Sequence, residues 1–286
     1  MHDNSFKSDG AKITGFSYNA SRPLTVFDCL YEIFWSLGQH KIWMMLGYNA
    51  LRAGTLRSTL GIIWLPLSLG ITIGLYGVLF GGFFGGDNGR YFPYLASGWV
   101  AWRFIGGLFT QSLMVYVRSR SHLETMNFPL PVYVFAKIYE LTVEFLLNLI
   151  VFAIVMGVTQ TPISYQALLF FPAIMLYWVG GCSIAFSGAF FCARYPDIQH
   201  LVGPIITSMF FLTPIIWRAE DATGPQRIFV QYNPFHYALD IFRQAFGISP
   251  INSESWIIVA AFAGGGFLVS LFIYRFYSRR VKHWIV

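Results

Sequence analysis

Six long apolar stretches, separated by shorter polar or glycine- and proline-rich stretches, dominate the pattern of hydrophobic and polar positions along the chain. A helix needs roughly 20 mostly apolar residues to cross the hydrocarbon core of a bilayer, and each of these stretches is long enough. The pattern therefore predicts an all-α integral membrane protein with six transmembrane helices. The predicted spans cover residues 59–83, 92–117, 131–157, 166–192, 199–217 and 255–276.

The chain divides into three predicted parts. Residues 1–24 are polar and lack the apolar core of a signal peptide, so we expect a mobile cytoplasmic tail. Residues 25–58 are expected to form an amphipathic interface helix and a basic segment that leads into the membrane. Residues 59–286 form the predicted transmembrane domain.

The amphipathic helix is predicted from residues 26–37. Apolar side chains at positions 26, 27, 30, 33, 34 and 37 share one face, while Asp28, Glu32 and Ser36 point the other way, and Gly38 ends the pattern. We expect this helix on the inner membrane surface. An ordinary helix packed on the cytoplasmic ends of the bundle is the alternative.

Composition and charge fit a membrane protein. Hydrophobic residues make up 56% of the chain and charged residues 11%, whereas soluble domains carry about 25% charged residues. With a cytoplasmic N-terminus, 14 of the 19 Lys and Arg residues lie inside, and Arg90, Arg218, Arg227 and Arg243 lie outside. This topology explains the net charge of +6 without nucleic-acid binding. The three Cys and six His residues show no metal-ligand spacing, so no metal site is predicted.

The third span contains charged residues, in the stretch KIYELTVEFLLN at 137–148. On a helix, one stripe holds Lys137, Glu140 (or Leu141), Glu144 and Asn148, because positions three and four apart share a face. A charge at the bilayer centre costs roughly 2.5–3.5 kcal/mol. The stripe must therefore face protein or water.

Arg103 in the second span is the expected partner of Glu144. Both residues lie about 20 Å from the predicted inner ends of their spans at 1.5 Å per residue. Two interpretations remain open for this pair. It either sets the register of two helices or, with the rest of the stripe, lines a polar substrate path.

Several motifs occur in order along the chain. They are TLGIIWLPLSLGI at 59–71 with Leu60, Gly61 and Trp64, YFPYLASGWVAWRF at 91–104, NFPLPVY at 127–133, ARYPDIQHLVGPIITSMFFLTPIIW at 193–217, and YNPFHYALDIFRQAF at 232–246 with Asn233 and Pro234. Over residues 25–280 the chain resembles permeases of polysaccharide-exporting ABC transporters of the Wzm, KpsM and TarG kind, which export O-antigen, capsule or teichoic acid.

The resemblance implies a homodimeric permease in the bacterial inner membrane, with both termini cytoplasmic and re-entrant helices between Trp217 and Ser255. The chain has no GxxxxGK[ST] phosphate loop, so ATP and Mg²⁺ would be bound by two separate ATPase subunits. The chain itself would bind no cofactor and catalyse no reaction. Its substrate would be a lipid-linked polysaccharide.

The resemblance also implies that two cytoplasmic loops contact the ATPase. The first, residues 118–131, offers an apolar knob of Leu123, Met126 and Phe128 rimmed by charges; the second, residues 193–200, could equally be a capped turn in which Asp197 starts the next helix. The predicted contact residues are Arg118, Arg120, His122, Leu123, Glu124, Met126, Arg194, Tyr195 and Asp197.

Aromatic residues suggest how a sugar polymer would pass, because aromatic faces stack on the C–H faces of sugar rings. The candidates for such a path are Trp99, Trp102, Phe109, Tyr139 and Phe145, although most of the 29 Phe residues are expected simply to fill the membrane core. Arg52 and Arg57 are expected to attract the phosphate of a lipid anchor at the cytoplasmic mouth.

Three alternatives to this function remain open. An ABC permease for a small lipophilic molecule or drug fits the same pattern. An integral membrane glycosyl or acyl transferase would need a catalytic pair, for which only His236 and Asp240 have suitable spacing. A secondary transporter would show two similar halves, and no repeat is evident.

Overall fold

The computed structural model describes residues 25–55, 59–85, 88–126, 128–281 and 284. These residues form helices and turns, without a strand among them. The first half contains α1 (Val26–Gly38), α2 (His40–Thr55), η1 (Gly61–Ile63), α3 (Trp64–Phe80), η2 (Gly81–Gly85), α4 (Asn88–Thr110), η3 (Ser112–Met114), α5 (Val115–Arg118) and α6 (Arg120–Thr125). The second half contains α7 (Leu130–Val158), η4 (Tyr165–Leu169), α8 (Phe170–Arg194), α9 (Ile198–Leu212), η5 (Ala219–Asp221), α10 (Pro225–Tyr232), α11 (Pro234–Ala245) and α12 (Ser253–Tyr277).

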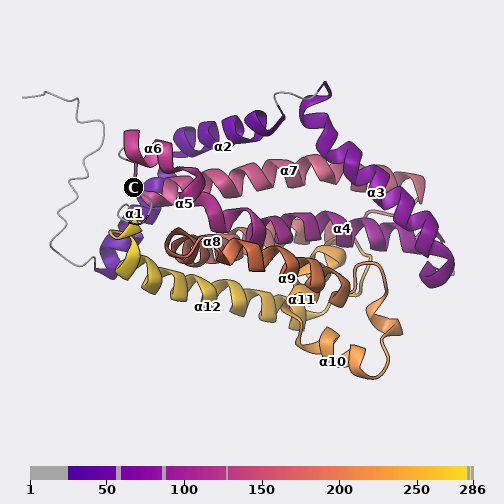
Figure 1. Cartoon of the computed structure of the whole chain (residues 1–286). Coiled ribbons are helices and arrows are strands. Elements are labelled where there is room, and N and C mark those ends of the chain that lie inside the picture. The colour runs from indigo at the N-terminus through magenta and orange to yellow at the C-terminus, as the bar shows by residue number, and fades with distance from the viewer. Residues whose placement is uncertain (1–24, 56–58, 86–87, 127, 282–283, 285–286) are drawn as a thin grey trace, which may run out of the picture.

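The long helices run side by side in an elongated bundle (Figure 1). Helices α1 and α6 lie at one end of this bundle, and α10 lies at the other. Four helical segments are long and apolar enough to cross a membrane: Gly61–Phe83, Leu130–Val158, Tyr165–Arg194 and Ser253–Tyr277. They coincide with four of the six predicted spans and confirm the prediction of an all-α membrane protein.

The other two predicted spans are helical but shorter than expected. The stretch 92–117 is not one continuous helix, because α4 ends at Thr110 and short helices follow. At this break the Ser112 hydroxyl donates to the Leu108 carbonyl oxygen, a bond that bends helices. In the stretch 199–217, α9 has only 15 residues. Pro214 ends this helix because the residue before a proline disfavours the helical conformation.

Helix α7 is the centre of the bundle and packs against α2, α3, α4 and α8. It begins beside Pro129, with Pro131 in its first turn, where the missing N–H groups cost nothing. Helix α2 approaches α7 closely through Gly47, since a side chain there would meet the carbonyl oxygen of Ala136. Small residues permit this kind of close helix contact.

Helix α1 forms where the amphipathic pattern predicts it, with Thr25 and Asp28 making a capping box at its start. Its polar side faces the protein, since Glu32 and Ser36 are buried. Its apolar side is exposed, and Phe27 retains 82% of its surface. A helix that contacts the bundle with one face and presents apolar side chains on the other combines the two arrangements that the sequence left open.

A buried hydrogen bond joins α1 to α12. The Tyr274 hydroxyl donates to Oε2 of Glu32 over 2.6 Å, and only 4% of Glu32 is exposed. Burial raises the pKa of the Glu32 carboxyl above its usual value of 4.5, against the opposing effects of the Tyr274 bond and the Arg279 charge. The folded protein therefore holds this proton more tightly than the unfolded chain does.

We expect Glu32→Gln to change how stability depends on pH. A raised folded-state pKa gives a contribution that is complete below the unfolded pKa of 4.5 and is lost as the pH rises through the folded pKa. Gln stays neutral and still accepts a hydrogen bond. Relative to the parent, the melting temperature of the variant in detergent should therefore rise as the pH increases above about 4.5.

Ser121→Ala, at an exposed residue of α6, changes no titrating group and is the control, and its difference from the parent should stay nearly constant with pH. A constant difference for Glu32→Gln as well would contradict the raised pKa.

Candidate functional site

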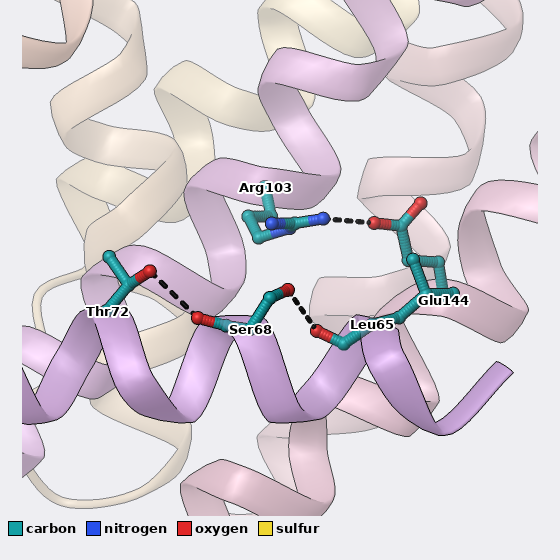
Figure 2. A network of polar contacts seen from close by, with 5 residues as sticks. All are labelled: Leu65, Ser68, Thr72, Arg103 and Glu144. Atoms are coloured by element: carbon teal, nitrogen blue, oxygen red, sulfur yellow. Dashed lines mark hydrogen bonds and ion pairs between the residues drawn. The ribbon is translucent and has the colours of Figure 1, made fainter. Parts of the chain in front are cut away.

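The predicted ion pair between the second and third spans is present. Nη2 of Arg103 on α4 lies 2.7 Å from Oε1 of Glu144 on α7 (Figure 2). The Arg103 side chain retains 35% of its exposure and the Glu144 side chain 17%, so the pair is neither sealed in the core nor free at the surface. A partly exposed ion pair in a membrane bundle needs water or a second protein surface beside it.

A second ion pair lies on the same stripe of α7. Nζ of Lys137 is 2.5 Å from Oε2 of Glu140, one helical turn along, and both side chains are largely buried. The three charges of the stripe therefore all have partners, two within α7 and one on α4. Pairing removes most of the cost of placing these charges in an apolar bundle.

Asn148, the last predicted member of the stripe, is buried at 1% exposure. Neither its amide nitrogen nor its amide oxygen has a hydrogen-bond partner among the described residues. A buried amide without partners is costly. With Asn148, the polar stripe of α7 continues beyond the two ion pairs.

Helix α3 borders the ion pair from a third side, as Figure 2 shows. It carries Ser68 and Thr72 beside Arg103, and both hydroxyls donate to carbonyl oxygens of α3 itself, at Leu65 and Ser68. We use the name polar seam for Ser68, Thr72, Arg103, Lys137, Glu140 and Glu144. The seam thus lies among α3, α4 and α7, which also contact one another.

Three of the predicted path residues belong to one aromatic row. Trp99, Trp102 and Phe109 all lie on α4 and meet rings from other helices. Phe210 of α9 lies 4.9 Å from Trp99 and 5.8 Å from Trp102 between ring centroids. Phe235 of α11 lies 5.4 Å from both Trp102 and Phe109. We call these five residues the aromatic row.

The structure places the other two predicted path residues elsewhere. Phe145 is 2% exposed and packs in the interior against Phe104 and Phe242. Tyr139 packs on Trp43 of α2, at 5.7 Å. Both lie on α7, but six residues apart they point to different sides of the helix, and neither side is that of the aromatic row. The structure does not bring them to the aromatic row, and their place on a substrate path stays a prediction.

Sequence reasoning missed Phe210 and Phe235 as members of the row. The signal for Phe235 was its position after Asn233 and Pro234. Asn233 caps α11 by accepting from the Phe235 N–H over 2.9 Å, and its side-chain amide donates to Thr213 over 2.9 Å. Pro234 occupies the first helical turn, where it suits the fixed geometry. This motif thereby fixes where the Phe235 ring lies.

The residues at the start of the first span have simpler roles. Gly61 adopts a φ of +56°, which glycine tolerates without strain. Leu60 and Trp64 flank it and are 43% and 50% exposed, so they lie on the outer surface of the bundle.

The first predicted contact loop forms α5 and α6. Arg118, Arg120, His122 and Glu124 are exposed, and Nε of Arg120 pairs with Oε1 of Glu124 over 2.8 Å. Leu123 was expected in an exposed knob, but it is 4% exposed and packs into the core. Arg120 and Glu124 are four residues apart and share the outer face of α6, whereas Leu123 is turned toward the core. Its burial anchors α6.

Met126 is the exposed apolar residue of this loop, at 40%. The second loop lies nearby, because Val117, directly before the first loop, packs on the same cluster as Cys192 at the end of α8 and Ile198 at the start of α9. Both loops therefore present their side chains at one end of the bundle.

In the second loop, Arg194 and Tyr195 are exposed, and the Arg194 guanidinium lies 5.5 Å from the Tyr195 ring. Asp197 precedes α9 without a capping hydrogen bond, so the alternative of a capped turn lacks its hydrogen bond. An acid that does not cap its own helix stays accessible to a partner.

The structure describes only one of the two residues predicted to attract a lipid phosphate. Arg52 is exposed in the last turn of α2, whereas Arg57 lies outside the described residues.

His236 and Asp240 do not form a catalytic pair. Nδ1 of His236 has no hydrogen-bond partner among the described residues, and the Asp240 oxygens accept from Gln244, Ser249 and Ser255. Because these hydroxyl and amide donors occupy its oxygens, Asp240 does not orient the His236 imidazole as the carboxylate of a catalytic pair would.

A protein-family model described as "ABC-2 type transporter" matches residues 30–246. This range runs from α1 to the end of α11 and includes the polar seam, the aromatic row and both contact loops. No curated protein matches the chain.

We expect Arg103→Glu and Glu144→Arg each to lower the melting temperature in detergent, because each leaves two like charges in contact. The double variant should recover most of the loss. A double-mutant cycle should give a coupling free energy of about 1–2 kcal/mol, less than for a fully buried pair because Arg103 remains partly exposed.

Transport by the swapped variant separates the two interpretations of the pair. Recovery of folding together with transport assigns the pair to helix register, whereas recovery of folding alone assigns it to the path. Additive single-variant effects would contradict the ion pair itself.

Proposed function

The chain belongs to the ABC-2 type transporter family, and from this premise we propose that it exports a lipid-linked polysaccharide from the cytoplasmic side of the bacterial inner membrane. Members of the family are the membrane subunits of transporters and act with an ATP-binding subunit. The chain is therefore a transport subunit and not itself an enzyme. The polysaccharide, the membrane and a homodimeric assembly are the proposed parts.

The proposal depends most on the position of Trp99 and Arg103. These residues lie four apart on α4 and therefore share a face, so that an aromatic ring stands one turn from a partly exposed ion pair. Sugar rings have apolar C–H faces that stack on aromatic rings and hydroxyls that bond to charged groups. The ring and the ion pair together offer both kinds of contact to a sliding glycan.

A homodimer would suit this arrangement. Arg103 keeps about a third of its side-chain surface accessible, at 35%, and α3 beside it is poorly buried, with apolar side chains facing outward. A homodimer that placed two seams opposite each other would enclose a polar conduit and spare Arg103 from lipid.

Export of a small lipophilic molecule is the second candidate, and one observation favours it. An apolar cavity of about 460 Å³ lies among α4, α8, α11 and α12. Its lining includes Phe109 and Phe235 of the aromatic row together with Gly181 and Gly266. Cavities of this size and apolarity are typical of sites for small organic molecules.

We expect the chain, extracted from its native membrane, to purify with an ATPase subunit through α6 and the α8–α9 loop. Met126→Glu should reduce the recovered ATPase about fivefold or more, since a charge would replace an exposed apolar contact. Tyr232→Glu, at a 76% exposed residue of α10 at the other end of the bundle, is the matched control and should have no effect.

Equal recovery of the ATPase with Met126→Glu and the parent would overturn the contact assignment. Recovery of no ATPase with the parent chain would count against the transporter assembly itself.

We expect cells that lack the chain to accumulate a lipid-linked glycan inside, and export to fail with an inactive ATPase. Trp99→Ala should slow glycan export about two- to tenfold, because a stacking ring contributes roughly 0.5–1.5 kcal/mol, and Trp99→Phe should retain most of it. The measurement is glycan at the cell surface at equal levels of the chain in the membrane.

Phe272→Ala removes a ring that is 63% exposed on α12 and serves as the control. Normal glycan export in cells without the chain would exclude the polysaccharide, and accumulation of a small lipophilic compound instead would favour the second candidate.

A further inference from the structure

A polar cavity of about 270 Å³ lies at the end of the bundle opposite α6, among α4, η5 and α11. Its lining includes Arg90, Arg218, Glu220, His236, Asp240 and Arg243. Three guanidinium groups and two carboxylates therefore line one small cavity. The cavity is separate from the aromatic row and shares no residue with the polar seam.

Arg243 at the base of the cavity is the most unusual of these residues, because it is a cation with 2% exposure. Its Nη2 donates to the carbonyl oxygens of Pro214 over 2.9 Å and Tyr94 over 3.4 Å, and its guanidinium lies 3.6 Å from the centre of the Tyr94 ring. Its Nε has no hydrogen-bond partner among the described residues. A buried arginine with neutral partners and an unused N–H calls for an anion.

Asp240 shares the cavity but is not that anion. Its Oδ2 accepts from Nε2 of Gln244 and from the Ser255 hydroxyl, both over 2.6 Å, and its Oδ1 accepts from the Ser249 hydroxyl over 2.7 Å. No ion pair joins Asp240 to Arg243 within the described part of the chain. The carboxylate is thus held by three neutral donors, away from the guanidinium.

His236 and Arg218 complete the donor set. Nδ1 of His236 is buried without a hydrogen-bond partner in the described residues. Burial lowers the pKa of His236 to about 4, so the ring is neutral at pH 7 and can donate one N–H. Arg218 is half-buried, whereas Arg90 and Glu220 are exposed at the rim of the cavity.

We propose that this cavity binds a phosphate group, with Arg243 Nε, Arg218 and His236 as its donors. Phosphate accepts several charge-assisted hydrogen bonds at once and suits arginine forks. The cavity is smaller than the roughly 300–1,000 Å³ of drug-sized sites, which fits one compact anionic group and not a polymer. The phosphate belongs either to a lipid headgroup or to a free ion.

The site goes beyond the proposed export function and does not depend on the exported molecule. A negative result here leaves glycan export untouched, because the polar seam and the aromatic row lie elsewhere on the chain. A positive result would hold equally for an exporter of small lipophilic molecules.

The test uses the full-length chain in maltoside detergent, which contains no phosphate. In one arm, sodium phosphate is titrated against sodium chloride at equal ionic strength. In the other, micelles contain either phosphatidic acid or diacylglycerol with the same acyl chains. Binding to the folded state raises the melting temperature, and the dependence on concentration gives the affinity.

We expect phosphate or phosphatidic acid to raise the melting temperature of the parent, and Arg218→Gln to weaken binding about tenfold or more. Arg218 is only half-buried and Gln keeps a polar side chain there, so this variant should fold. Arg243→Gln should abolish binding, although loss of its bonds to Pro214 also lowers the basal stability. Arg227→Gln, at an exposed arginine of α10 outside the cavity, is the matched control and should bind as the parent does.

A response to sodium phosphate alone identifies a free ion, and a response to phosphatidic acid over diacylglycerol identifies a lipid headgroup. The proposal is overturned if neither probe stabilises the parent. It is equally overturned if Arg218→Gln responds like the parent, or if Arg227→Gln loses binding to the same extent as Arg218→Gln.

Discussion

The need to pair every charge that enters an apolar bundle is the constraint on which this structure depends. Arg103 and Glu144 meet over 2.7 Å between α4 and α7, where an unpaired charge would cost several kcal/mol. Because α7 packs against α1, α2, α3, α4, α5 and α8, the rotation that brings Glu144 to Arg103 also decides which faces those neighbours receive. This ion pair therefore constrains how α4 and α7 pack against each other.

The same constraint acts at both ends of the bundle. Glu32 is buried because Tyr274 donates to it, and this bond holds the polar face of α1 against α12. At the other end, Asn233 bonds to Thr213 and Arg243 bonds to the Pro214 carbonyl, which together hold α11 against the turn after α9. A few polar contacts thus position short helices that apolar packing alone would leave free to slide.

The parts of the structure proposed for different steps of transport lie in different places. The contact loops lie at one end, the ion pair and the aromatic row lie along the helices, and α11 supports the row from the other end through Phe235. A displacement of α6 by a partner would reach α4 through the short helices that follow Gln111. The broken helix therefore connects the proposed partner surface to the proposed path.

The sequence by itself determined four spans and the pairing of Arg103 with Glu144, because run length and depth along a span are one-dimensional properties. Tertiary structure alone decided that Leu123 and Phe145 are buried and that the polar face of α1 turns inward. Periodicity tells which residues share a face but not what that face meets. In a membrane protein this limit is severe, since lipid tails are as apolar as a packed core and hydrophobicity cannot distinguish them.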